Sequence, residues 1–159
     1  AKIIKKKYPN VKFQLVGWYD GKSDSISKKN LDDWVQTGII EYLGVIEDVK
    51  PVIANCSVYV LPSFYGEGIP RTVLEAMSMG RPIITTNVAG CRQTVKEGEN
   101  GLLVPARSVD KLVEAISFFI TNEDCIIPMG IASRKIAEEK YDVRKVNLMM
   151  LKKMGLSQK

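Results

Sequence analysis

The sequence contains no histidine, and it has no apolar run of the roughly 18 residues that a transmembrane helix needs. Without histidine, the Ser-His and Cys-His nucleophile pairs and the commonest general base near neutral pH are excluded. The three cysteines are widely spaced and odd in number, which argues against a disulfide framework and against a zinc site. Chemistry in this chain must therefore rest on carboxylates, backbone amides or groups of a substrate.

The composition is that of a soluble globular protein. The chain has 159 residues, of which 45% are hydrophobic and 26% are charged, and this length suits a single domain over residues 1–159 with one core. The net charge of +5 lies largely in lysines near the two ends, which favours solvated helix faces over a nucleic-acid patch. The start lacks a signal peptide, so we expect a reducing, cytoplasmic setting.

Five β-prone runs alternate with helical patterns along the chain. The runs are VKFQLVGWY, IIEYLG, VYVLPS, PIITT and GLLVP. The helical patterns cover residues 1–8, 25–37, 47–55, 71–79, 93–96, 108–121, 128–140 and 142–154. This alternation predicts an α/β fold, a Rossmann-like parallel sheet with helices on both faces. Because residues 1–8 resemble the last two turns of a helix, we expect the domain and its first strand to begin upstream.

The loop PSFYGEGIPRTVLEAMSMG has the features of a ligand site. It follows the strand VYVLPS, and ligands of parallel sheets bind where strands end and helices begin. The helix predicted to begin at Pro70 or Arg71 presents free backbone N–H groups and a positive dipole end, which suit a phosphate. Arg71 and Thr72 add a charge and a hydroxyl there.

Two glutamates, Glu67 and Glu75, flank this anion site. Their carboxylates are expected on the order of 10 Å apart, about the span from the sugar to the ribose of a nucleotide-diphosphate sugar. Each end of that ligand offers adjacent hydroxyls that donate to a carboxylate. The spacing is too large for the carboxylate pair of a retaining hydrolase. The alternative is that Glu67 is a solvated loop residue and that Glu75 is present only because the helix dipole favours a glutamate in the opening turns of a helix.

The segment PSFYGEGIPRTVLEAMSMGRPIITTNVAGCRQTVKEGENGLLVP resembles the donor-site core of family 4 glycosyltransferases, which are retaining enzymes of two-lobed GT-B architecture. Glu67 and Glu75 match both glutamates of that family's Glu-x7-Glu motif. The EAM-x-x-G-x-P-I-I stretch and the GENGLLVP ending match as well. The specific similarity covers roughly residues 57 to 105, with looser similarity over the whole chain.

The resemblance implies that this C-terminal lobe binds a nucleotide sugar, with UDP or GDP as the nucleotide. Glu67 would be the catalytic residue at the hydroxyls of the donor sugar, and Glu75 would contact the ribose. The backbone over Gly68, Ile69, Pro70, Arg71 and Thr72 would approach the sugar and the phosphates. The resemblance further implies that no metal and no other cofactor is needed. It also implies that the leaving phosphate itself takes the acceptor proton, so that catalysis rests on positioning and on stabilisation of the departing diphosphate.

Three departures from the family pattern bear on donor binding. The basic Arg and Lys pair that neutralises the diphosphate would lie before Ala1, which suggests weak binding. Pro70 stands where many members have glycine, so one backbone N–H is missing. Gln93 replaces a common glutamate, and we expect no large effect from this change.

Other positions are open to two readings. Gly44, Val45 and Ile46 follow a strand and would line the base pocket, although a plain strand-to-helix turn explains them nearly as well. The aromatic residues Trp18 and Tyr19 favour core or interface packing over stacking on a ligand. Arg92 favours a solvated turn over a phosphate contact, and Asn100-Gly101 is typical of a tight turn.

The sequence therefore predicts a hexosyltransferase whose acceptor, a glycan or a lipid-linked sugar, is bound mainly by an N-terminal lobe outside this chain. The fragment alone is expected to be inactive, and bacterial polysaccharide biosynthesis is implied by the resemblance alone. The location implied is the cytoplasm, with peripheral association of the full enzyme at the inner face of the membrane left open. Two rival classes are a catalytically degenerate Rossmann-like binding module and a basic membrane-surface domain.

Overall fold

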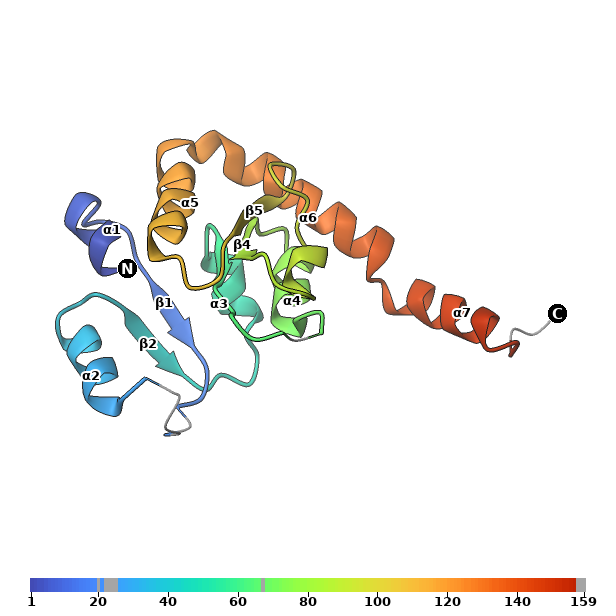
Figure 1. Cartoon of the computed structure of the whole chain (residues 1–159), viewed down its shortest axis with the longest axis horizontal. Helices are drawn as coiled ribbons and strands as arrows, with labels where there is room; N and C mark the ends of the chain where they lie inside the picture. Colours follow the sequence, from blue (N-terminus) through green and yellow to red (C-terminus); the bar gives the residue numbers. More distant parts are fainter. Residues whose placement is uncertain (20, 22–25, 67, 157–159) are drawn as a thin grey trace. The chain divides into compact units, whose positions relative to one another are not determined.

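The computed structural model describes residues 1–19, 21, 26–66 and 68–156. The chain forms two compact units, Ala1–Val49 and Lys50–Lys159, and each is described by itself. Figure 1 colours the elements in chain order from blue to red. The prediction of a single domain stays a prediction.

The described residues of the first unit form two helices and a two-stranded parallel sheet. Its elements are α1 (Lys2–Lys7), β1 (Gln14–Val16), α2 (Lys28–Gln36) and β2 (Glu41–Gly44). β1 pairs with β2 in parallel, with Gln14 opposite Glu41. The hydroxyl of Ser27 accepts a hydrogen bond of 3.2 Å from the backbone N–H of Asn30 and so caps α2. The two predicted helices and the parallel pairing are thus confirmed.

The first strand is shorter and less buried than the sequence indicates. The run VKFQLVGWY predicts a buried strand, but β1 has three residues and Leu15 is 38% exposed. A register shift between Leu15 and Val16, followed by Gly17 at a φ of 145°, ends the ladder. Trp18 is 81% exposed, so it does not pack in the core, and interface packing stays a prediction.

The second unit contains a three-stranded parallel sheet in the order β3-β4-β5. Its strands are β3 (Tyr59–Leu61), β4 (Ile83–Thr86) and β5 (Gly101–Val104), with Tyr59 opposite Ile83 and Ile83 opposite Gly101. Its α-helices are α3 (Lys50–Asn55), α4 (Arg71–Ser78), α5 (Val109–Thr121), α6 (Ile126–Lys140) and α7 (Val143–Lys153). Two short 3₁₀ helices, η1 (Cys91–Gln93) and η2 (Glu123–Cys125), complete it.

Helices cover both faces of this sheet, as the sequence predicts. All four residues of β4 are buried, and successive side chains point to opposite faces. Ile84 joins a core cluster with Ala115 and Phe119 of α5 and with Met129 of α6. On the other side, α4 packs against β4 and α6 and buries its apolar residues Val73, Ala76 and Met77. Figure 1 shows α5 and α4 on opposite sides of the strands.

Several helix boundaries differ from the sequence-based prediction, and α2, expected from residue 25, begins at Lys28. The helix expected over residues 93–96 is wrong, because η1 ends at Gln93 and the chain then turns so that Lys96 N–H binds the side chain of Asn100. α3 begins at Lys50 instead of Glu47. α6 begins at Ile126, two residues before the expected Pro128. Proline is tolerated in the first turn of a helix, because an N–H at that position would have no intrahelical partner.

Asn100 is a buried polar centre that connects the end of the η1 segment to α6. Its Oδ1 accepts a hydrogen bond of 2.7 Å from Lys96 N–H, and its Nδ2 donates to the Thr94 carbonyl at 3.1 Å and to Ser133 Oγ at 3.3 Å. Ser133 Oγ in turn donates to the Asn100 carbonyl at 3.2 Å. Asn100 is therefore more than the turn residue that the sequence suggests.

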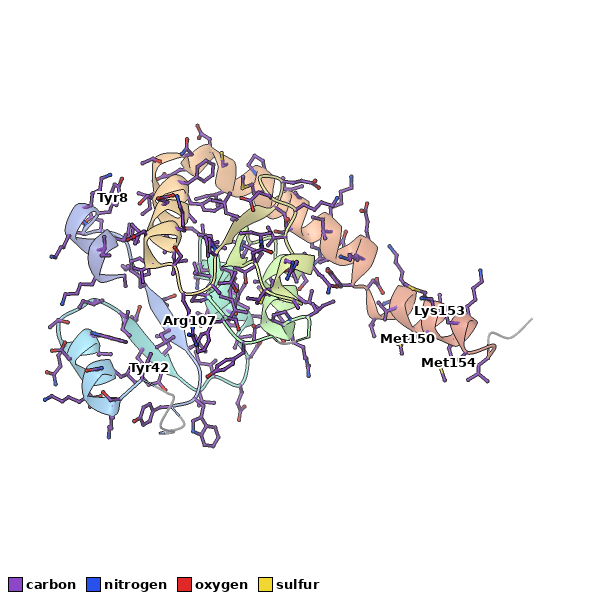
Figure 2. All side chains as sticks on the ribbon, in the orientation of Figure 1. Tyr8, Tyr42, Arg107, Met150, Lys153 and Met154 are labelled. Carbon is purple, nitrogen blue, oxygen red and sulfur yellow. The ribbon has the colours of Figure 1, made fainter. Side chains whose placement is uncertain are left out.

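The C-terminal helix α7 has no buried residue. Asp142 caps it by accepting a hydrogen bond of 2.8 Å from Arg144 N–H. Figure 2 labels Met150, Lys153 and Met154 along it. Within the described residues, no single helix is long and apolar enough to cross a membrane. One helix pair, Val109–Thr121 and Glu123–Lys153, is bent by 91° and has the length and composition of a membrane span, by these two criteria only.

Candidate functional site

The loop between β3 and α4 is held by two hydroxyls of the neighbouring strand. Thr85 Oγ1 donates a hydrogen bond of 2.8 Å to the carbonyl of Leu61, the last residue of β3. One residue further along, Thr86 Oγ1 donates to the carbonyl of Ser63 within the loop. Both threonines are buried, so these bonds are shielded from water and fix where the loop leaves the sheet.

α4 begins directly after this loop, as the sequence predicts. Pro70 is its N-cap residue, buried and extended at a φ of −66° and a ψ of 122°, so the chain turns from extended loop into helix at this residue. Arg71 and Thr72 follow in the first turn and are exposed. The first backbone N–H groups of a helix lack intrahelical partners, so this end of α4 offers donors and a partial positive charge to an anion.

Glu75 lies one turn inside α4 with its side chain exposed, near Tyr59 and Thr72. Burial raises the pKa of the Tyr59 phenol, the charges of Glu75 and Cys56 raise it further, and a hydrogen bond with the Thr72 side chain opposes them. The phenol is thus a neutral donor or acceptor at neutral pH. Tyr59 connects β3 to the exposed polar side of α4.

Glu67 lies outside the described residues, so its distance from Glu75 stays a prediction. Its neighbours Gly68 and Ile69 are described and exposed, and a Cβ at Gly68 would meet no atom within 4 Å in the part of the chain that the structure describes. The predicted residues from Gly68 to Glu75 therefore form one continuous stretch, from the loop into the second turn of α4. All of them except Pro70, Val73 and Leu74 are exposed.

Gly44, Val45 and Ile46 belong to the first unit and follow β2. Gly44 has a φ of 69°, and its carbonyl accepts a hydrogen bond of 2.9 Å from Gly17 N–H. A glycine is favoured at this φ, so the turn alone explains its presence. Val45 is 69% exposed. The base-pocket role of these three residues stays a prediction.

Sequence reasoning missed two groups that support the site. The sequence indicates only a strand position for Tyr59. Its partners Thr72 and Glu75 lie on α4, which follows later in the chain. Thr86 was likewise read as a strand residue, although a hydroxyl at a buried strand position signals a partner to be satisfied. Arg92, the other phosphate candidate, is exposed in η1.

One surface hollow does not belong to the site. A hollow near Ser78, Gly80 and Gly130 lies at the carboxyl end of α4, opposite the end that begins at Arg71. Among the residues that the structure describes, no group of three or more His, Cys, Asp or Glu side chains is placed to hold a metal ion.

A family model described as "Glycosyl transferases group 1" matches residues 1–122 of the sequence. The chain belongs to this family. The match spans both units and includes the whole stretch from Gly68 to Glu75. The resemblance noted in the sequence is confirmed at this level.

Two of the curated relatives are bacterial glycosyltransferases. The chain is 33% identical over 111 residues to N,N'-diacetylbacillosaminyl-diphospho-undecaprenol alpha-1,3-N-acetylgalactosaminyltransferase of Campylobacter jejuni, covering 70% of this chain and 28% of that protein. It is 30% identical over 140 residues to the capsular polysaccharide biosynthesis glycosyltransferase CapM of Staphylococcus aureus, covering 88% and 36%.

Solved glycosyltransferase structures share the fold. HepE of Anabaena, solved in complex with UDP, matches with a TM-score of 0.83 at 24% identity over 92% of this chain and 41% of that chain. Sucrose-phosphate synthase of Thermosynechococcus elongatus matches with a TM-score of 0.76 at 26% identity, covering 89% and 37%. The α/β fold with parallel sheets is that of GT-B glycosyltransferases. The chain spans between 28% and 41% of the length of these four proteins.

Proposed function

We propose that this chain is the donor-binding lobe of a hexosyltransferase and that it binds a nucleotide-activated hexose with UDP or GDP as the nucleotide. The observation that carries the proposal is the start of α4, where Arg71, Thr72 and Glu75 are exposed along the first two turns directly after the anchored loop. The diphosphate would lie at the helix N-terminus, the ribose at Glu75 and the sugar at Glu67.

The charges at this helix end suit such a ligand. The free N–H groups of the first turn and the guanidinium of Arg71 attract phosphate oxygens. The Glu75 carboxylate accepts hydrogen bonds from the two ribose hydroxyls. Pro70 has no N–H, so the first donors to the phosphates are Arg71 N–H and Thr72 N–H together with the Thr72 hydroxyl.

In the complete enzyme, we propose transfer with retention of configuration, as the resemblance to family 4 implies. Glu67 would hold the hydroxyls of the donor sugar, and the leaving phosphate would accept the proton of the acceptor hydroxyl on the same face of the sugar. The α4 N-terminus would stabilise the charge that builds up on the departing diphosphate. Positioning supplies the remainder of the rate enhancement.

The acceptor that we propose is a growing glycan or a lipid-linked sugar, bound with the help of an N-terminal lobe. The names of the Campylobacter and Staphylococcus relatives, which refer to a diphospho-undecaprenol-linked sugar and to a capsular polysaccharide, support this class. We place the reaction in bacterial polysaccharide biosynthesis, in the cytoplasm or peripherally at the inner face of the membrane. The chain by itself is proposed to bind donor without transferring sugar.

Ligand-observed NMR on the 159-residue chain tests donor binding. Saturation transfer is recorded with UDP-glucose, GDP-mannose and ADP-glucose, and competition gives the affinity for each. We expect one nucleotide to bind in the millimolar range. Glu75→Gln keeps the size of the side chain and removes its charge, so ribose contacts should weaken about tenfold. Glu139→Gln, an exposed change on α6, is the matched control and should bind like the parent chain.

Two results would contradict the proposal. In the first, a folded parent chain gives no saturation transfer with any of the three nucleotide sugars, which would favour a binding module of another kind. In the second, binding is equal in the Glu75→Gln and Glu139→Gln proteins, which would move the site away from α4.

A further inference from the structure

Two aromatic rings lie exposed in the loop that precedes Glu67. Phe64 and Tyr65 are 41% and 57% exposed, and their ring centroids are 4.1 Å apart at an interplanar angle of 35°. Neighbouring exposed rings leave apolar area in contact with water, and such patches mark binding sites more often than scattered single residues do. The donor site that we propose uses neither ring.

A cation from another loop lies over one of these rings. Arg107, labelled in Figure 2, is in the loop between β5 and α5, and its guanidinium carbon is 4.8 Å from the centroid of Phe64. β3 and β5 flank β4 in parallel, so both loops leave the same carboxyl edge of the sheet. We call Phe64, Tyr65 and Arg107 the aromatic cluster.

The left-handed backbone of Arg107 destabilises the fold by more than its cation–π contact with Phe64 stabilises it. Its φ is 60°, and within the described residues it is the one non-glycine residue with a positive φ. A Cβ in this left-handed region costs roughly 1–2 kcal/mol, which glycine would avoid. An exposed cation–π contact returns only about 0.5–1 kcal/mol. Folding stability therefore does not account for an arginine at this position.

The chemistry of the cluster suits a sugar ring. The faces of aromatic rings carry partial negative charge, and the C–H groups on one face of a pyranose are weakly positive and apolar. A guanidinium that lies over a ring still presents N–H groups along its edge, in a fork that donates to neighbouring hydroxyls. Stacking area and a hydroxyl-binding fork thus lie within one cluster.

We propose that the aromatic cluster is a pyranose-binding subsite beside the donor site. This inference rests on the proposed function, in which Glu67 holds the donor sugar, because Phe64 and Tyr65 shortly precede Glu67 in the sequence and Arg107 lies over Phe64. A nucleobase also stacks on aromatic rings, but the base would extend beyond Glu75, at the other end of the ligand. The pyranose belongs either to the donor hexose or to the acceptor glycan, and one experiment distinguishes the two.

Protein-observed NMR on the chain with ¹³C-labelled Phe and Tyr tests the cluster. One arm adds methyl α-glucoside, methyl α-mannoside or methyl α-N-acetylglucosaminide in the presence of free UDP. The other arm adds UDP-glucose alone, with UDP alone as its reference. We expect the ring signals of Phe64 and Tyr65 to shift with a pyranose and not with UDP. A shift with glycosides assigns the subsite to the acceptor, and a shift with UDP-glucose only assigns it to the donor hexose.

Arg107→Gly separates ligand binding from folding. It removes the guanidinium and relieves the left-handed backbone, so the melting temperature should stay equal or rise while the affinity for the pyranose falls about fivefold. Tyr65→Ala should lower that affinity similarly by removing a stacking face. Lys111→Ala, which removes one exposed positive charge from α5, is the control and should leave the affinity unchanged.

The outcomes separate this inference from the proposed function. The subsite is wrong if no pyranose shifts the two rings, if UDP alone shifts them equally, or if Arg107→Gly binds sugar like the parent chain. If UDP binding persists and depends on Glu75 in those cases, the donor site still stands. If glycosides shift the rings but no nucleotide binds, the donor site fails and the sugar subsite is supported.

Discussion

Gly130 of α6 lies against Gly80, just beyond α4, so closely that a Cβ at Gly130 would stand 2.2 Å from the carbonyl oxygen of Gly80. No rotamer change relieves this clash, because the atom that it meets belongs to the backbone. The contact sets how near α6 approaches the helix that carries the candidate site.

Gly130→Ala should therefore destabilise the protein, although alanine is the better helix former by about 1 kcal/mol. Overpacking of this kind costs about 1–3 kcal/mol, and we expect a net loss in the free energy of unfolding. Urea denaturation measures it. Gly66→Ala is the control, because a Cβ at Gly66 meets no atom of the described residues within 4 Å. Equal urea midpoints for Gly130→Ala and Gly66→Ala would contradict this prediction, because α6 would then move away from Gly80 without loss of stability.

Asn100→Ala should cost about 2–3 kcal/mol, because it leaves the backbone N–H of Lys96 and the carbonyl of Thr94 without their side-chain partners. Ser133→Ala removes only the α6 end of the same network and should cost about 1 kcal/mol. Thermal and urea unfolding measure both variants. If Ser133→Ala costs as much as Asn100→Ala, the anchoring of α6 is the dominant effect instead of the turn.

Thr86→Val keeps the shape of the side chain and removes the hydroxyl that binds the Ser63 carbonyl. We expect a loss of about 1 kcal/mol in stability and roughly threefold weaker donor binding, because the loop is no longer held. Thr85→Val is the matched change, since its partner Leu61 is still within β3. It should lower stability similarly and affect donor binding less. The opposite order would show that the strand end, not the loop, positions the ligand.

The Tyr59 phenol makes stability depend on alkaline pH. Its pKa in the folded chain is raised, mainly by burial and then by the charge of Glu75, so folding favours the protonated form. This stability is fully present below the unfolded pKa near 10 and is lost as pH rises through the folded pKa. The parent chain should therefore lose more stability than Tyr59→Phe as the pH rises above about 10. Parallel curves for the two proteins in urea titrations would show that the phenol is not perturbed.

Donor binding should not require a divalent metal, because Arg71 and the α4 N-terminus supply positive charge to the diphosphate. We expect the same affinity for the nucleotide sugar in EDTA, in Mg²⁺ and in Mn²⁺. Arg71→Gln should weaken binding about tenfold under all three conditions. A rise in affinity with Mg²⁺ or Mn²⁺ that EDTA reverses would contradict the proposal.

Much of the secondary structure was predictable because its signals are local. Apolar spacing marked α2, Ser108 marked the start of α5, and Asp142 marked the start of α7. The parallel strands followed from their alternation with helices. Boundaries failed where a turn decides them, as at Gly17 and after η1, because a run of apolar letters does not show where hydrogen bonding stops.

The sequence by itself determined the family and the order of the elements, and it predicted the stretch from Gly68 to Glu75, because these depend on residues close together in the chain. Only the tertiary structure decided that Tyr59 lies beside Glu75, that Asn100 reaches Ser133 and that Arg107 lies over Phe64. These contacts join residues far apart in sequence, and packing against the β3-β4-β5 sheet brings them together. No periodicity or spacing in the chain carries that information.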